Sequence, residues 1–193
     1  MRNSKYTLNK REFINYKFFN SLFLGLSIGT VFTIYSVLEP SIFSFGGVIL
    51  AFSLLFVAKI YTKILNIRYF FYISMLVEVV MLIAIIYFLL KPYHYQTALF
   101  VYIGYQIIFT FGSYLVRAET IFLKKSQILS FVDVAKQKGY LLGMLISFVF
   151  YKVIEYFGIN SSEYQVFYIH FLLFMVQLLI IYLLFLSFKE KNV

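Results

Sequence analysis

Six apolar stretches of about twenty residues alternate with short polar joints, and this pattern constrains the fold more than any other feature of the chain. Each stretch is long enough to cross the hydrocarbon core of a bilayer as an α-helix. The stretches are apolar on every side, whereas the strands of a membrane barrel alternate polar and apolar residues. We therefore predict an all-α, polytopic integral membrane protein with six transmembrane helices in a single domain, residues 1–193. The predicted helices cover residues 18–38, 43–62, 69–90, 97–116, 139–157 and 164–187.

The composition leaves little room for any other kind of domain. Hydrophobic residues make up 62% of the 193 residues, and six spans leave too few residues for a soluble catalytic domain. The chain has a net charge of +9, and its basic residues lie in short joints beside the spans, where they can contact lipid head groups. We therefore predict that the chain interacts with a lipid bilayer and does not bind nucleic acid.

The distribution of basic residues predicts the orientation. All but two of the 17 Lys and Arg residues fall on one side of the predicted spans, and the exceptions are Lys91 and Lys152. Cytoplasmic loops carry an excess of Lys and Arg. We therefore expect both termini in the cytoplasm and the protein in a bacterial inner membrane.

One joint, residues 117–138, is longer than the others and has mixed charge. Within it Ile128, Val132 and Ala135 share one helical face, opposite Asp133 and Lys136. This pattern predicts either a short interfacial helix over residues 127–136 or an extension of the fourth or fifth span.

Glu78 is the most unusual side chain within the spans, because it lies about nine residues, or roughly 13 Å, inside the third. A charge at such a depth is costly and usually faces a protein interior or a cavity. One interpretation is proton coupling through Glu78 or through His170 of the sixth span. The alternative for Glu78 is a buried ion pair with Lys59, and for His170 a hydrogen bond to a neighbouring helix.

Other polar side chains and glycines inside the spans are candidates for helix contacts. The polar ones could line a cavity, and they are Thr30, Thr33, Tyr35, Tyr102 and Gln106. Two GxxxG pairs allow close helix packing in the first and fifth spans, and they are Gly25 with Gly29 and Gly139 with Gly143. We find no group of residues typical of an enzyme active site, no metal-ligand spacing and no cofactor motif. We therefore predict that the protein is not an enzyme and binds no metal or cofactor.

Two segments resemble a known family. The joint between the second and third spans reads AKIYTKILNIR, which keeps Lys63 of the G-x-x-x-D-[RK]-x-G-[RK] motif of major facilitator superfamily transporters. It replaces the first Gly, the Asp and the second Gly by Ala58, Thr62 and Leu65. The stretch LSFVDVAKQKGYLLGMLISFVF is similar to the run from the fourth–fifth joint into the fifth helix. Together with the topology, the chain resembles a single six-helix half, of the N-terminal type, of such a transporter.

This resemblance implies roles for the candidate residues. Helices one, two, four and five of such a half face a central cavity, which favours Thr30, Thr33, Tyr35, Tyr102 and Gln106 as cavity residues. Helix three lies outside the cavity, which favours a structural role for Glu78. The resemblance also implies a cytoplasmic gate of charged residues, namely Lys63, Arg68, Arg117 and Glu119.

A single half cannot alternate access by itself. We therefore expect transport of a small, unidentified solute by a homodimer or by this chain with a second membrane protein. One alternative is a membrane scaffold, assembly factor or accessory subunit that does not transport. Another is the substrate-capture subunit of a vitamin importer, whose first helix carries a small-residue stripe that Gly25 and Gly29 would supply.

Overall fold

The computed structural model describes residues 6–190, so Arg2, Lys5 and Lys191 of the predicted basic side lie outside the described residues. Six of its helices are long and apolar enough to cross a membrane, which confirms the predicted set of six. They are α1 (Lys10–Tyr35), α2 (Pro40–Lys59), α4 (Ile67–Leu90), α5 (Tyr95–Leu123), α6 (Ser126–Tyr156) and α7 (Ser162–Ser187).

Three helices extend well beyond the predicted spans at the end where the chain termini lie. α1 begins at Lys10 rather than at residue 18, α5 continues to Leu123, and α6 begins at Ser126. The structure therefore has no separate interfacial helix at residues 127–136, and this segment forms the first turns of α6. Its apolar face packs on protein, because Val132 is fully buried and Ile128 lies against the same core.

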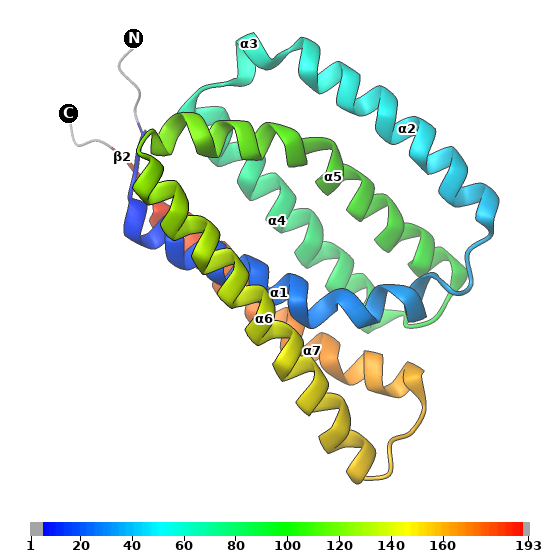
Figure 1. Ribbon diagram of the computed structural model, residues 1–193. Helices are drawn as coiled ribbons and strands as arrows, with labels where there is room; N and C mark the ends of the chain where they lie inside the picture. The colour runs from blue at the N-terminus through cyan, green and yellow to red at the C-terminus, as the bar shows by residue number, and fades with distance from the viewer. Residues whose placement is uncertain (1–5, 191–193) are drawn as a thin grey trace.

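Two small features were not predicted. A short helix, α3 (Tyr61–Ile64), follows α2, and two strands, β1 (Tyr6–Leu8) and β2 (Phe188–Glu190), pair antiparallel. Strands of three residues are too short to give a periodic pattern in the sequence. Their pairing holds residues 6–8 and 188–190 side by side (Figure 1), which fits an even number of membrane crossings, since these leave both segments on the same side.

The helices form two groups that meet through α4 and α7. α1 lies against α6 and α7, α5 lies against α2 and α4, and α4 packs on α7 (Figure 1). In the view of Figure 1, α1, α2, α5 and α6 lie toward the viewer, with α4 behind α5 and α7 behind α1 and α6. We call the surface formed by α1, α2, α5 and α6 on this side the front face.

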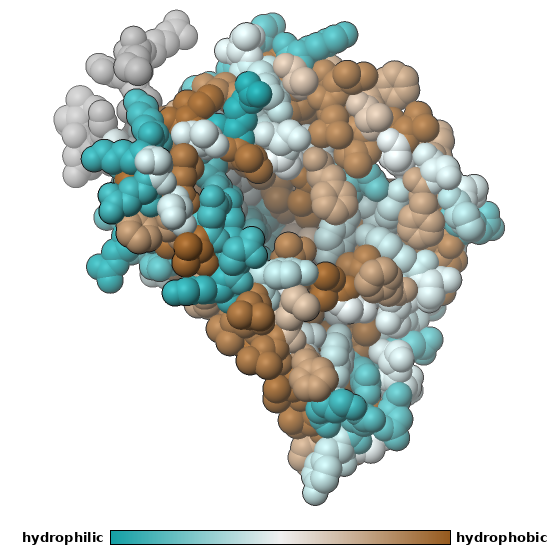
Figure 2. Space-filling model, viewed as in Figure 1, coloured by the Kyte–Doolittle hydropathy of each residue, from teal (hydrophilic) through white to brown (hydrophobic). Residues whose placement is uncertain are grey.

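The outer surface is apolar, which fits a multi-pass membrane protein. Large apolar side chains are exposed on every long helix, among them Phe52 on α2, Ile83 on α4 and Phe148 on α6. A soluble protein rarely exposes apolar surface on this scale, whereas lipid tails cover it readily. Hydrophilic residues gather near the chain ends, and a smaller group lies at the opposite tip of the molecule (Figure 2).

At the end of the bundle away from the chain termini, one tyrosine joins the α4–α5 joint to α7. The Tyr93 hydroxyl donates to the backbone carbonyl of Glu163, which ties the α4–α5 joint to the start of α7. Burial raises the pKa of the Tyr93 phenol well above its ordinary value, so the group remains a hydrogen-bond donor.

Candidate functional site

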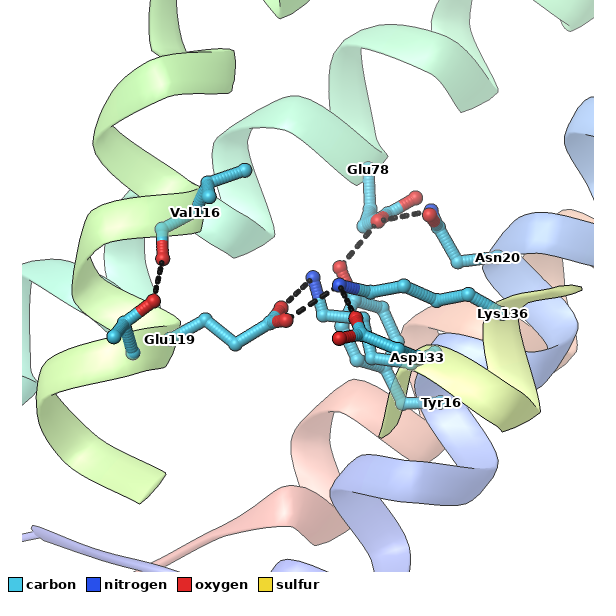
Figure 3. Close-up of polar contacts among 9 residues, drawn as sticks. Tyr16, Asn20, Glu78, Val116, Glu119, Asp133 and Lys136 are labelled. Atoms are coloured by element: carbon cyan, nitrogen blue, oxygen red, sulfur yellow. Dashed lines mark hydrogen bonds and ion pairs between the residues drawn. The ribbon is translucent and has the colours of Figure 1, made fainter. Parts of the chain in front are cut away.

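Glu78 is buried at the contact between three helices. Its Oε1 accepts hydrogen bonds from the Tyr16 hydroxyl at 2.7 Å and from Asn20 Nδ2 at 2.9 Å, both on α1 (Figure 3). Gln177 Nε2 of α7 donates to Glu78 Oε2 and to the Glu78 carbonyl, each at 2.9 Å. The carboxyl group of α4 therefore connects α1 and α7.

The ion pair considered between Glu78 and Lys59 is wrong, because the partners of Glu78 are Tyr16, Asn20 and Gln177. Lys59 is exposed at the end of α2, a helix that packs on α5 rather than on α4. Neutral donors satisfy the carboxyl oxygens, which offsets part of the cost of burying the group. Tyr16 was missed because the first span was predicted to start at residue 18. Its spacing of four residues from Asn20 places both on one face of a helix.

Glu119 forms a second buried cluster close to the first. Its Oε2 lies 2.8 Å from Lys17 Nζ of α1, and its Oε1 lies 2.5 Å from Lys136 Nζ of α6. Lys136 also lies 3.5 Å from Asp133 Oδ1 (Figure 3). Glu119 is only 4% exposed, so this carboxylate is held by two cations away from bulk solvent.

The predicted gate pairs Glu119 with the wrong cations. Among the described residues, its ionic partners are Lys17 and Lys136 rather than Lys63 or Arg68. Arg68 instead lies over the ring of Tyr72, and Arg117 lies over the ring of Tyr61. The sequence could not show this arrangement, because Lys17 appeared to belong to a polar N-terminal tail. Glu119 links α5 to α1 and α6, two helices with which α5 has little other contact.

The predicted cavity residues fall in different places. Tyr35 and Tyr102 come together, with ring centroids 5.6 Å apart, and the Tyr102 hydroxyl donates to the Phe43 carbonyl at 3.3 Å. Thr33 is half-buried and lies two residues before Tyr35, so it is on a different face of α1, while Thr30 donates to the Ser27 carbonyl at 2.7 Å. The Tyr35 hydroxyl and Gln106 Oε1 are buried without a hydrogen-bond partner in the described part of the chain.

His170 lies deep between helices rather than at an open surface. Its Nδ1 is 2.6 Å from the Val166 carbonyl, and its ring packs at a tilt against Phe88 with centroids 4.0 Å apart. Together with Thr30 it borders a small void of about 20 Å³, enough for a single water molecule. These contacts give His170 a packing role.

All four glycines of the two pairs lie in the contact between α1 and α6, and three of them pack against backbone. A Cβ on Gly25 would collide with the Tyr140 carbonyl, and a Cβ on Gly143 would collide with the Leu22 carbonyl. Gly139 faces the backbone of α1 in the same way, whereas Gly29 has ordinary contact distance to the Tyr151 side chain. The backbones of α1 and α6 therefore touch along this line.

A polar stripe on α5 is the main feature that the sequence reasoning missed. Its members recur at intervals of three and four residues and so share one helix face, and they are Gln106, Thr110, Ser113, Arg117 and Thr120. Ser113, Arg117 and Thr120 border an open hollow of about 720 Å³. Thr110 borders a groove of about 400 Å³ between α5 and α2. The spacing alone would have revealed this stripe, which we call the α5 stripe.

The first turns of α6 carry a similar pattern. Ser126, Ser130, Asp133 and Gln137 border an open hollow of about 560 Å³. Figure 2 shows the front face hollowed between α5 and α6. The front face thus combines apolar flanks with polar side chains around its centre.

Neither a metal-binding cluster nor a similar known protein defines the site further. Among residues 6–190, no group of three or more His, Asp or Glu side chains is placed to hold a metal ion. Comparison with protein-family models, with curated proteins and with solved structures found no match to this chain.

Proposed function

We propose that this chain is one six-helix half of a secondary transporter of the major facilitator type. It would move a small solute across a bacterial inner membrane, with both termini in the cytoplasm, when its front face meets another half. The observation that carries this proposal is the α5 stripe, whose polar side chains open onto a hollow in an otherwise lipid-like surface.

The arrangement of the helices supports the proposal. The front face consists of α1, α2, α5 and α6, which are the first, second, fourth and fifth spans, and the third and sixth spans lie behind (Figure 1). The resemblance to major facilitator transporters implies that these same four helices face the transport cavity. In transporters built from repeats, the solute is held between the two halves.

The physical chemistry of the front face also favours a hydrated surface. Hydrocarbon offers no hydrogen bonds, so polar side chains within spans usually face protein or a water-filled cavity. Ser113 and Arg117 are exposed, and Gln106 keeps an unpartnered oxygen. Glu78 and His170 both have internal partners, which favours structural roles for them over proton coupling.

One specific observation favours a second function, that of a membrane scaffold or accessory subunit. α2 packs mainly on α5 and exposes a large apolar surface, including Phe45 and Phe52, that a larger membrane protein could cover. The third candidate function, that of a substrate-capture subunit of a vitamin importer, has less support than these two. Gly25 of its docking stripe is buried against α6, so that residue is not on the outer surface.

Transport can be tested without knowing the solute. Purified protein is reconstituted into liposomes loaded with a small-molecule extract of the host cells, and the retained solutes are quantified by mass spectrometry. We expect the wild type to release a defined subset of solutes that protein-free liposomes retain.

A matched pair of variants locates the path. Ser113→Phe fills the hollow of the front face and should reduce release at least about tenfold, while Ile83→Phe on the exposed side of α4 should leave it unchanged. Equal solute retention in wild-type and protein-free liposomes would contradict a transport function and favour the scaffold.

A further inference from the structure

We infer that the missing half is a second copy of this chain, bound face to face through a two-fold axis along the membrane normal. This inference rests on the proposed function only for the claim that the front face meets another half. A closed two-fold interface uses the same surface on both copies, so that surface must be complementary to itself.

The front face needs a protein cover rather than a lipid one. The hollow beside the α5 stripe reaches into the predicted span at Ser113, while Arg117, Asp133 and Gln137 border the hollows beyond the spans. Lipid tails cannot form hydrogen bonds with Ser113, whereas a facing protein surface and the water held behind it can.

Asp133 and Arg117 are two exposed charges of opposite sign on the two sides of this face, and Lys138 adds a second exposed cation beside the start of α6. On the α6 side, Asp133 is 71% exposed, and its cation Lys136 is 3.5 Å away and already bound more closely by Glu119. On the α5 side, Arg117 is exposed over the Tyr61 ring and has no carboxylate partner among residues 6–190. Each copy therefore offers one exposed carboxylate, Asp133, and at least two exposed cations, Arg117 and Lys138.

A two-fold axis along the helices brings these charges together. Such an axis places α6 of one copy opposite α2 and α5 of the other. Glu119 and Lys136 are in contact and so mark one level of the bundle. Arg117 is two residues from Glu119, and Asp133 is three residues from Lys136. At a rise of 1.5 Å per residue, the backbones of Arg117 and Asp133 therefore differ in height along the bundle axis by less than about 8 Å. Long side chains can cross such a gap. Asp133 of each copy would thus meet Arg117 of the other, twice per dimer.

The apolar flanks are complementary in the same arrangement. α2 exposes Phe45 and Phe52, and α6 exposes Leu141 and Phe148. These side chains would pack across the two edges of the interface, outside the polar centre.

Charge reversal tests the pairing. The oligomeric state in mild detergent is measured by light scattering for the wild type and for Asp133→Arg, Arg117→Asp and the double variant. We expect a dimer of this chain alone, weakened roughly tenfold or more by each single reversal and restored by the double one. Glu155→Arg, at the other end of α6, should leave the dimer unchanged.

Disulfide crosslinking tests the geometry independently of those charges. The chain has no cysteine, so Ile121→Cys and Val134→Cys, which lie at the same height by the Glu119–Lys136 contact, can be co-expressed on two differently tagged copies and oxidised in membranes. A mixed disulfide is expected for this pair, and none for Leu76→Cys with Leu179→Cys on α4 and α7.

Two results would overturn the inference. One is a monomer in membranes that forms no Ile121–Val134 crosslink, and the other is a complex with a different protein on this face. Transport could still hold with a different partner, and a dimer could form without transport, so the two proposals fail separately.

Discussion

Glu78 shows how a membrane domain can bury a carboxyl group on neutral hydrogen-bond donors. Three neutral donors from α1 and α7 reach its two oxygens, and one of these donors also binds its carbonyl. The sequence predicted that Glu78 faces a protein interior or a cavity, because a charge in hydrocarbon is costly. It could not predict the partners, because Tyr16, Asn20 and Gln177 lie far away along the chain and are chosen by helix packing.

Replacing Glu78 should destabilise the protein by leaving those donors without an acceptor. Glu78→Leu leaves the groups of Tyr16, Asn20 and Gln177 unsatisfied, and each such group costs about 1–3 kcal/mol. Glu78→Gln keeps an oxygen for Tyr16 and Asn20 and should lose less. Thermal unfolding in detergent measures both. If Glu78→Leu melted at the wild-type temperature, the structural role would be wrong.

At the scale of the helices, the sequence predicted the number and order of the membrane helices correctly, but it placed several helix ends wrongly. Apolar runs report only the part of a helix that meets lipid, whereas α1, α5 and α6 continue past it. Those extensions carry Lys17, Glu119 and Lys136, so the ionic cluster falls in what the sequence showed as joints. The α5 stripe was visible in the sequence as polar residues at helical spacing, and it was overlooked.

The contact between α1 and α6 depends on glycine. A Cβ at position 143 would meet the Leu22 carbonyl and lie 3.0 Å from the Leu26 nitrogen, and backbone atoms cannot easily move aside. We therefore expect Gly143→Ala to lower stability by about 1–3 kcal/mol. Chemical or thermal unfolding in detergent provides the measurement.

Gly112→Ala is the matched control, because nothing lies within 4 Å of a Cβ built there. Removing glycine from a helix at such an open site should be neutral or stabilise by up to about 1 kcal/mol. Equal destabilisation by the two variants would show that helix propensity, rather than close packing, explains the effect.

For the whole molecule, the pairing of β1 with β2 constrains the membrane topology. β1 and β2 hold both ends of the chain at the same end of the bundle. The basic residues predict that this end is cytoplasmic. Reporters fused at residues 91–96 and 158–163 should therefore read out from the outside, and a reporter at the C-terminus from the cytoplasm. The reverse readout would invert the orientation but leave the fold unchanged.

The central claim is that the α5 stripe faces water rather than lipid, and thiol labelling tests it most directly. Because the chain has no cysteine, Thr110→Cys, Ser113→Cys and Ile83→Cys each introduce a single reactive group. In intact membranes, a membrane-impermeant maleimide should label positions 110 and 113, while position 83 on the exposed side of α4 should react only in detergent. Positions 110 and 113 that stay as unreactive as position 83 until detergent is added would contradict the account.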